Sequence, residues 1–381
     1  MPLTEKHVQF PNLNGIRFIA AFAVFIHHIE QIKQLLGCEN HYYGFVSQNM
    51  GKLGVALFFV LSGFLITYLL LDEKNRNGKI NTKNFYIRRI LRIWPLYFII
   101  FILSFFIFPQ FGFLKEPHDF ILWDNGFIYR FLLFLFFLPN FAIVFFGSPY
   151  LCTPTWSIGI EEQFYAIWPW IVGSKNPLKS LLKAAVIFGS IIGLLWVVVF
   201  YTGLFGDEAQ NIFKTKLLHF LGQFRILAMI IGAGGAHLVY FKKTYILNIL
   251  YRKDIQIMVY IILLGLLLIN FHPDNINLEF YGLFFCFLII NVATNPESLI
   301  NLNNPIMEYL GKISYGIYIY HSAVIMIVIN IIKTYLNPNL SHSVFNILTY
   351  VFSTIFTVIV CHISYKFIEE PLLKMKSRFI Y

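Results

Sequence analysis

The sequence predicts an all-α membrane protein, a polytopic helical bundle of about ten transmembrane helices plus one re-entrant or short helix. Of its 381 residues, 58% are hydrophobic and only 13% are charged, whereas soluble globular chains are about 45–50% apolar. Apolar runs long enough to cross a bilayer recur along the whole chain. This composition excludes a soluble enzyme, and nothing in the chain resembles a nucleic-acid-binding module.

Ten apolar runs are expected to cross the membrane. They lie near 15–35, 54–71, 93–112, 127–146, 182–204, 221–241, 255–271, 278–294, 313–333 and 344–367. A further apolar stretch, 156–172, is ambiguous. Pro139, Gly147, Pro149 and Pro154 interrupt this region, and broken backbone at membrane depth is tolerated only inside protein or beside a water-filled cavity. We therefore expect only one of 127–146 and 156–172 to span fully.

The net charge of +10 predicts orientation in the membrane. Basic residues concentrate in 73–92, 175–183, 242–253 and the C-terminal tail at 374–378. The positive-inside rule favours the cytoplasm for all four segments, and ten crossings place them there together with both termini. We expect a multi-pass protein of the inner (cytoplasmic) membrane, with one domain filling residues 1–381. No cleavable signal sequence precedes the first apolar run, which is expected to remain as a span.

The cysteines predict neither a disulfide framework nor a metal site. Cys38, Cys152, Cys286 and Cys361 are far apart and form no CxxC or Cys/His cluster. Cys38 and Cys152 are both compatible with the outer side, and the sequence leaves their pairing open.

The segment Leu13–Glu30 combines an apolar run with ionisable residues. Arg17 stands near its start, and His28 follows eleven residues later, which is roughly 16 Å further along a helix axis. That depth is near the middle of a hydrocarbon core about 30 Å thick. An ionisable group there is costly, so a functional role is the default hypothesis. The alternative is a histidine hydrogen-bonded between packed helices.

The third span begins with arginines. Arg89 and Arg92 project from one helix face beside Arg88, where guanidinium groups can bind phosphates in bidentate fashion. Anchoring of the span at the interface is the alternative. In the second span, the Ser62–Gly63 pair is interpreted as a site of close helix packing.

The segment Thr155–Trp170 contains two adjacent glutamates in an aromatic, apolar stretch. On a helix, Ser157, Glu161 and Tyr165 share one face, while Glu162 points about 100° away. A carboxylate at membrane depth needs a partner, and we expect Glu161 to contact His28. His321, further along, lies between tyrosines, whereas His237 and His362 are interpreted as satisfied core histidines and Glu370 as a solvated end charge.

Six motifs together resemble the acyltransferase 3 family of bacterial integral-membrane acyltransferases. They are LNGIRFIAAFAVFIHH, FFVLSGFLIT, RRILRIWPLY, WSIGIEEQFYAIWP, ISYGIYIYH and the terminal IEEP, in the family's order between residues 13 and about 372. The resemblance implies transfer of an acyl group, usually acetyl, from cytoplasmic acyl-CoA to a carbohydrate or lipid-linked acceptor. Surface polysaccharides, lipopolysaccharide and peptidoglycan are typical targets in the family.

The resemblance also implies roles for particular residues. The family's arginine–histidine signature falls on Arg17 and His28, which marks His28 as the catalytic histidine. Its Arg-x-x-Arg signature falls on Arg89 and Arg92, which are thought to engage the CoA donor. Its Trp-Ser…Glu…Phe-Tyr element falls on Trp156, Ser157, Glu161, Phe164 and Tyr165. Asn14 stands where the family most often has Asp, and a capping role would survive that change. No hydrolase-like second domain is expected, which suggests a stand-alone member.

These arguments predict a membrane O-acyltransferase that uses acyl-CoA and no metal. His28 would be a general base or would carry the acyl group transiently. Arg89, Arg92 and the neighbouring Arg88 would hold the donor's phosphates, with Arg17 and Glu161 completing the catalytic set. The substrate-binding candidates are Trp156, Ser157, Tyr165 and His321.

Two other functions also fit the residues. A transporter of a glycan or small molecule could use buried His, Glu and Arg as a proton relay, although paired broken helices in two halves of the chain are not evident. A non-catalytic subunit that supports a partner enzyme would tolerate neutralisation of these ionisable residues. The acceptor, the acyl chain and the oligomeric state are not determined by the sequence.

Overall fold

The computed structural model describes residue 10 and residues 12–114, 125–201, 208–271, 273, 277–335 and 341–379. Within these ranges the secondary structure is entirely helical. The α-helices are α1 Asn12–Leu35, α2 Phe45–Asn77, α3 Thr82–Ile102, α4 Phe127–Leu135, α5 Pro139–Phe146, α6 Trp156–Gly173, α7 Pro177–Tyr201, α8 Glu208–Gln223, α9 Ile226–Tyr240, α10 Thr244–Leu250, α11 Lys253–Leu268, α12 Asn277–Thr294, α13 Pro305–Lys312, α14 Ser314–Tyr335, α15 His342–Ser364 and α16 Glu370–Met375.

Short π- and 3₁₀-helical segments extend or join these helices. The π-helices are η1 Leu103–Ile107 and η5 Tyr365–Glu369, and the 3₁₀ turns are η2 Phe108–Gln110, η3 Gly112–Leu114, η4 Thr153–Thr155 and η6 Lys376–Phe379. The last of these, η6, follows α16 and forms the end of the described chain.

The predicted all-α polytopic membrane class is confirmed. Seven stretches of the described chain are long and apolar enough to cross a membrane: Asn12–Leu35, Asn49–Asn77, Thr82–Gln110, Pro177–Val199, Asn211–Tyr240, Ser314–Tyr335 and His342–Met375. The shorter apolar helix Leu278–Thr294 accompanies them. By this criterion the described chain offers fewer spans than the ten expected, because α11 has only 16 residues, Leu278–Thr294 is also too short, and the expected span 127–146 is divided.

That division lies between α4 and α5, which have nine and eight residues. Neither reaches the roughly 20 residues that cross a hydrocarbon core. Phe137 adopts a left-handed conformation at the break, with φ of 59°, and Pro139 follows in the first turn of α5. The expected interruption of 127–172 is therefore confirmed. The helix α6 is unbroken, yet with 18 residues it is not among the seven stretches, so neither 127–146 nor 156–172 meets this criterion for a full span.

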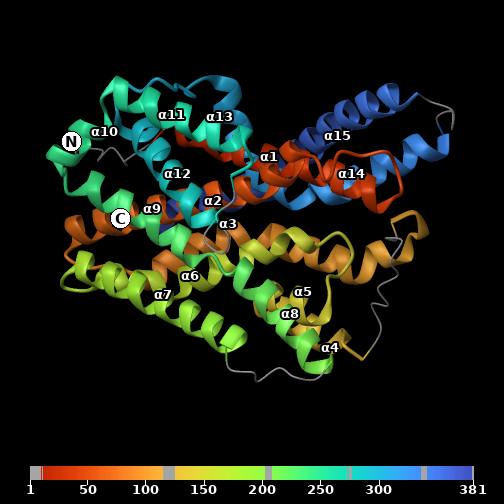
Figure 1. Cartoon of the computed structure of the whole chain (residues 1–381), viewed down its shortest axis with the longest axis horizontal. Helices are drawn as coiled ribbons and strands as arrows, with labels where there is room; N and C mark the ends of the chain where they lie inside the picture. Colours follow the sequence, from red (N-terminus) through yellow and green to blue (C-terminus); the bar gives the residue numbers. More distant parts are fainter. Residues whose placement is uncertain are drawn as a thin grey trace.

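The long helices α1, α2 and α14 run through the middle of the molecule along its long axis, and α15 packs beside α14 (Figure 1). The helix α7 lies along the edge of the molecule away from α15 (Figure 1). Its residues Val186 and Leu194 are 67% and 64% exposed. Exposed apolar side chains on a long peripheral helix indicate a surface that faces lipid. The central helices carry the polar residues discussed below.

The helices α2 and α9 cross with their backbones in direct contact. A Cβ atom added to Gly63 would lie 1.9 Å from the carbonyl oxygen of Met229, and one added to Gly232 would lie 1.9 Å from that of Val60. Small residues allow this approach between membrane helices. The packing interpretation of Gly63 is confirmed, whereas its neighbour Ser62 points elsewhere.

Three of the four basic segments meet at one end of the bundle. Lys74, after the apolar part of α2, donates a hydrogen bond to the carbonyl of Ser174 in the next basic loop. Arg88 donates to the carbonyl of Phe379 in the C-terminal tail over 2.8 Å. The loop 73–92, the loop near 175 and the tail therefore lie on the same side.

The fourth basic segment, 242–253, and the start of α1 lie at that end as well. Tyr240, the last residue of α9, packs its ring on Tyr68 with centroids 5.4 Å apart, and Phe10 packs on the same ring at 5.0 Å. Tyr68 lies in α2 close to Lys74. We call this side the basic end, and the opposite side the far end.

The far end contains a buried ion pair one turn beyond the α1 histidines. Glu30 accepts a hydrogen bond from Lys33 over 2.8 Å, and both side chains are almost fully buried. The same carboxylate accepts from the hydroxyl of Tyr350 over 2.7 Å and from the backbone N–H of His41. These bonds fix the loop that follows α1 against α1 and α15.

Candidate active site

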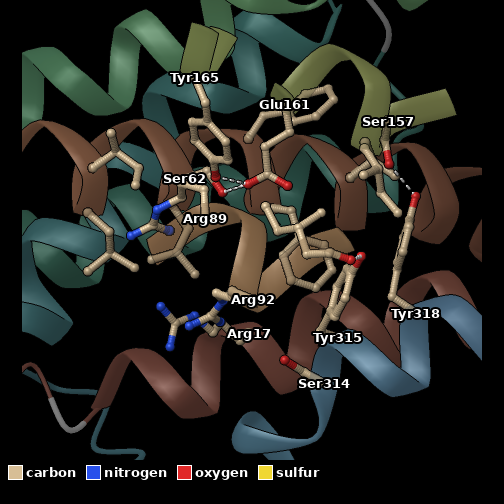
Figure 2. A pocket seen from close by; sticks show the side chains of 18 of the residues that line it. Arg17, Ser62, Arg89, Arg92, Ser157, Glu161, Tyr165, Ser314, Tyr315 and Tyr318 are labelled. Atoms are coloured by element: carbon tan, nitrogen blue, oxygen red, sulfur yellow. Dashed lines mark hydrogen bonds between the residues drawn. The ribbon is translucent and has the colours of Figure 1, made fainter. Parts of the chain in front are cut away.

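A cavity of about 180 Å³ lies between α1, α2, α3, α6 and α14, with η6 at its edge (Figure 2). Its polar lining consists of Arg17, Ser62, Arg89, Arg92, Ser157, Glu161, Tyr165, Ser314, Tyr315, Tyr318 and Lys376. Apolar side chains of α2, α3 and α6 complete the wall. Of the ten predicted site residues, six line this cavity: Arg17, Arg89, Arg92, Ser157, Glu161 and Tyr165.

The cavity carries an excess of positive charge. Four of its lining residues have basic side chains (Arg17, Arg89, Arg92 and Lys376), and among the described lining residues Glu161 is the one carboxylate. Basic side chains that share a partly dry space repel one another when charged and lose hydration. A bound anion with several negative charges would relieve both costs.

Two of these guanidinium groups are held in place by neighbours that do not neutralise them. Arg17 donates from Nη1 to the amide oxygen of Asn14 over 2.8 Å. Arg89 lies over the rings of Phe85 and Tyr165, at 5.7 and 5.6 Å from their centroids. Its Nε atom is buried and has no hydrogen-bond partner. Asn14 lies inside α1, which begins at Asn12, so its amide orients Arg17 and does not cap the helix.

The pKa of Lys376 is lowered by burial and by the positive charges at the basic end. Burial, together with repulsion from Arg89, Arg92, Arg17 and Arg88, lowers the pKa of this lysine to about 6. An amine with this pKa is largely neutral at pH 7.5 and becomes charged when an anion binds beside it.

Glu161 bonds within the cavity and does not contact His28. Its Oε1 atom accepts hydrogen bonds from the hydroxyls of Ser62 on α2 and Tyr165 one turn along α6 (Figure 2). The expected Glu161–His28 contact is therefore wrong. Two hydroxyl donors satisfy the carboxylate locally, and His28 lies further toward the far end.

The opposite wall of the cavity is built from tyrosines of α14. Tyr318 hydrogen-bonds with Ser157 over 2.6 Å and donates to the carbonyl of Pro154 over 3.0 Å. Tyr315 donates to the carbonyl of Ile93 over 2.8 Å. These bonds connect α14 to α3 and to the start of α6, and they fix the position of the wall.

His28 and His321 face each other beyond this wall, and we call them the histidine pair. Their ring centroids are 4.7 Å apart. The Nδ1 atom of His28 lies 2.9 Å from the carbonyl of Val24, and that of His321 lies 3.0 Å from the carbonyl of Ile317. Because a carbonyl only accepts, each Nδ1 carries the proton, and each Nε2 presents a lone pair. The Nε2 atom of His321 is buried and has no partner.

Tyr318 connects the cavity to the histidine pair. It lines the cavity, and its ring centroid lies 6.0 Å from that of His321. His28 and His321 are not among the residues that line the cavity. The structure therefore separates a cationic compartment at the basic end from an imidazole compartment, with one tyrosine between them.

The remaining predicted residues lie outside the cavity. Arg88 donates to Glu73 over 2.8 Å and also to Phe379, so its guanidinium group is directed at the loop and the tail. Trp156 packs edge-on against Phe59, with centroids 6.2 Å apart. Neither Arg88 nor Trp156 is a lining residue.

The other titratable candidates have local partners. His237 packs on Phe241 with centroids 4.4 Å apart, and His362 bonds to the hydroxyl of Tyr309. Glu370 forms an exposed ion pair with Lys374. All four cysteines are free, and within the described ranges no group of three His, Cys, Asp or Glu residues is placed to hold a metal ion.

Sequence reasoning missed several lining residues. Ser62 was assigned to packing, and Ser314, Tyr315, Tyr318 and Lys376 were not singled out. One available signal was the spacing within SYGIYIYH, because residues four and seven apart share a helix face. That spacing places Ser314, Tyr318 and His321 on one side of α14.

Fold and site together define a helical membrane protein with a buried cavity lined by basic side chains, which Tyr318 separates from a pair of neutral imidazoles. The family model described as "Acyltransferase domain" matches residues 10–366. The chain belongs to this acyltransferase 3 family, and it is a membrane acyltransferase. The resemblance read from the six motifs is thereby confirmed.

Curated relatives share this similarity over most of the chain. The peptidoglycan O-acetyltransferase OatA of Listeria monocytogenes is 26% identical over 406 residues, covering 97% of this chain and 56% of the relative. The Bacillus subtilis protein named "Putative peptidoglycan O-acetyltransferase YrhL" is 27% identical over 397 residues, with the same coverage. The chain thus spans little more than half the length of these relatives. No solved structure gives a significant match.

Proposed function

We propose that the protein transfers an acetyl group from cytoplasmic acetyl-CoA, through the membrane domain, to a hydroxyl group of a cell-surface or lipid-linked glycan. The observation that carries this proposal is the cavity in which Arg17, Arg89, Arg92 and Lys376 face one carboxylate. Such a site suits a donor with several phosphate charges. Acyl-CoA has these charges at one end and its reactive thioester at the other.

The size and position of the cavity fit a donor that has its phosphate charges at one end and its thioester at the other. Pockets that enclose drug-sized ligands measure about 300–1,000 Å³, so a cavity of about 180 Å³ accommodates the slender pantetheine arm better than the whole cofactor. The phosphates would remain at the basic end, where Arg89 and Arg92 offer bidentate donors. Arg17 lies with these groups, so we assign it to the donor and not to direct chemistry at His28.

Glu161 has a positioning role in this proposal. It fixes the hydroxyls of Ser62 and Tyr165, and it balances part of the positive charge while the cavity is empty. Ser157 and Tyr318 border the path of the thioester toward the histidine pair.

His28 supplies the chemistry of acyl transfer. In the general-base route, its Nε2 atom takes the proton of the acceptor hydroxyl while the hydroxyl oxygen attacks the thioester carbonyl. The C–S bond then breaks, and the coenzyme A thiolate receives that proton from the imidazolium. In the covalent route, the same lone pair attacks the thioester carbonyl first, and the C–S bond breaks to release the coenzyme A thiolate. The acetyl group then passes from Nε2 to the acceptor hydroxyl oxygen, and the hydroxyl proton goes to the thiolate. Tyr318 must shift in either route for the thioester to reach His28.

The acceptor is a carbohydrate hydroxyl that arrives from the far end. His28 is seven residues from the end of α1, roughly 10 Å along the helix axis, so an extracytoplasmic glycan has the shorter approach. Two relatives carry the name peptidoglycan O-acetyltransferase, which makes peptidoglycan glycan strands the first acceptor to test. The basic end, with both termini, would face the cytoplasm across the inner membrane.

The test uses the full chain in lipid nanodiscs with radiolabelled acetyl-CoA and glycan acceptors. His28→Ala should abolish label transfer and leave binding of coenzyme A unchanged, because the donor's phosphates bind about 16 Å away at Arg17. The matched control is His27→Asn, which keeps a donor for the carbonyl of Ser47 and should retain most of the activity. Wild-type transfer by His28→Ala would refute the assignment.

A further inference from the structure

The C-terminal segment η6 lies against the cationic cavity. Lys376, its first residue, lines the cavity together with Arg17, Arg89 and Arg92. These cations come from three separate parts of the chain: α1, α3 and the tail. Within the described chain, the ammonium group of Lys376 forms no ion pair. A basic tail would gain more hydration at the surface, so its placement here needs an explanation.

Arg88 holds the tail in this position. Its Nη1 atom donates to the carbonyl of Phe379, and its Nη2 atom donates to Glu73, each over 2.8 Å. The side chains of Arg88 and Glu73 are only 12% and 6% exposed. This largely buried pair ties the end of the chain to α2 and α3, and it fixes Lys376 beside the arginines that repel it.

We propose that Lys376 is a fourth cationic ligand for the phosphates of the donor and that η6 closes the basic end of the cavity over them. The inference rests on the proposed use of acyl-CoA and adds a binding residue and a moving part to it. Arg88 is then a positioning residue for the tail. An anion in the cavity converts the repulsion between Lys376 and the arginines into shared attraction.

The charges that face Lys376 support this assignment. Arg17 faces it from α1, and three arginines face it from α3: Arg88, Arg89 and Arg92. Glu161 of α6 also lines the cavity, and its carboxylate is held by two hydroxyl donors. Glu369 of η5 lies near Arg92. Positive charge dominates this set, so a ligand carrying several phosphate charges is favoured over a neutral or basic one.

The first test measures the affinity of the full chain in nanodiscs for coenzyme A and for 3′-dephospho-coenzyme A. Lys376→Gln should weaken binding of coenzyme A about tenfold, the effect of one charge-assisted contact. Lys374→Gln is the matched control, because it removes the same charge from the same tail at a side chain that is 74% exposed, and its affinity should equal that of the wild type. A smaller loss with 3′-dephospho-coenzyme A would assign Lys376 to the 3′-phosphate, and an equal loss would assign it to the diphosphate.

The second test measures the pH dependence of the same affinity. The pKa of Lys376 is lowered to about 6 by burial and by the neighbouring arginines, and a bound phosphate raises it, so binding takes up a proton. Affinity should therefore fall between pH 7 and pH 8.5 by up to about tenfold per pH unit. Lys376→Arg should flatten this slope, since arginine stays protonated throughout.

The outcomes separate the two proposals. If the wild-type protein does not bind coenzyme A, the proposed function fails and this inference fails with it. The proposed function stands if the wild type binds coenzyme A and Arg89→Lys weakens that binding. The role of Lys376 is then refuted if Lys376→Gln has the same affinity as Lys374→Gln and if the affinity of Lys376→Arg depends on pH as that of the wild type does.

Discussion

At the scale of single residues, two backbone hydrogen bonds determine what the histidine pair can do. His28 and His321 each direct Nδ1–H at the carbonyl four residues earlier on their own helix. This local bond fixes the neutral tautomer without any carboxylate, and it leaves both Nε2 lone pairs available between α1 and α14. A buried carboxylate beside His28 is therefore unnecessary for orientation, which explains why Glu161 serves the cavity instead.

The guanidinium of Arg89 gives the sharpest single-residue prediction. Arg89→Lys keeps the charge but loses the planar fork, the contacts with Phe85 and Tyr165, and the second hydrogen bond to phosphate. The dissociation constant for coenzyme A should rise about tenfold, and the rate at saturating donor should change little.

The control for this variant is Arg76→Lys at the same end of the bundle. Arg76 pairs with Asp72 across one turn of α2, outside the cavity, and its replacement should leave the affinity unchanged. An unchanged affinity in Arg89→Lys would contradict the phosphate-binding role, whatever the control shows.

How far the site was predictable also depends on particular residues. Arg17, Arg89, Arg92, Glu161 and Tyr165 were identified because ionisable or hydroxyl groups at membrane depth are conspicuous in a sequence. Ser62 and Tyr318 were not, since a serine beside glycine and a tyrosine in an aromatic helix are ordinary packing residues. Their function arises from contacts between helices that are distant in the sequence, and no local pattern encodes such contacts.

At the scale of helices, the crossing of α2 and α9 fixes the position of Ser62, and therefore of the Glu161 network. The two backbones touch at Gly63 and Gly232, where a Cβ atom would meet a carbonyl oxygen at 1.9 Å. Backbone atoms cannot move aside as a flexible side chain can. One methyl group must therefore separate the helices or distort one of them.

Gly232→Ala tests this crossing. We expect a destabilisation of about 1–3 kcal/mol or more from overpacking, seen as a lower midpoint of thermal unfolding in detergent. Gly234→Ala is the matched control two residues away, because a Cβ atom there meets nothing within 4 Å. Equal midpoints for the two variants would show that the close contact carries no constraint.

Helix prediction succeeded where hydrophobic runs were continuous and failed where the chain breaks inside a run. The run 127–146 has the composition of a span, yet Phe137 turns into a left-handed conformation and divides it into α4 and α5. Pro139 signalled a boundary near that point, but composition alone does not show whether a proline kinks a helix or ends it.

At the scale of the whole molecule, the four basic segments share one end and the imidazole compartment lies toward the other. Under the proposed function, this polarity would separate a donor entrance from an acceptor entrance within one bundle. The transfer reaction would then run across the membrane, from a cytoplasmic acyl-CoA to an extracytoplasmic glycan.

The orientation can be tested by labelling cysteines in intact cells with a membrane-impermeant maleimide, in a Cys38→Ser background. Tyr43→Cys, at a far-end position that is 71% exposed, should react from outside. Lys243→Cys, at an exposed basic-end position, should react only after the membrane is permeabilised. The reverse pattern would invert the proposed topology and remove the cytoplasmic source of acyl-CoA from the cationic cavity.

The ion pair of Glu30 and Lys33 has a consequence for biosynthesis. The two residues are three apart on one helix, so they can neutralise each other before any other helix has been made. The nascent first span can then partition from the translocon into lipid without two bare charges, a step that would otherwise be costly. Tyr350 joins this pair only later, when the last long helix has been synthesised.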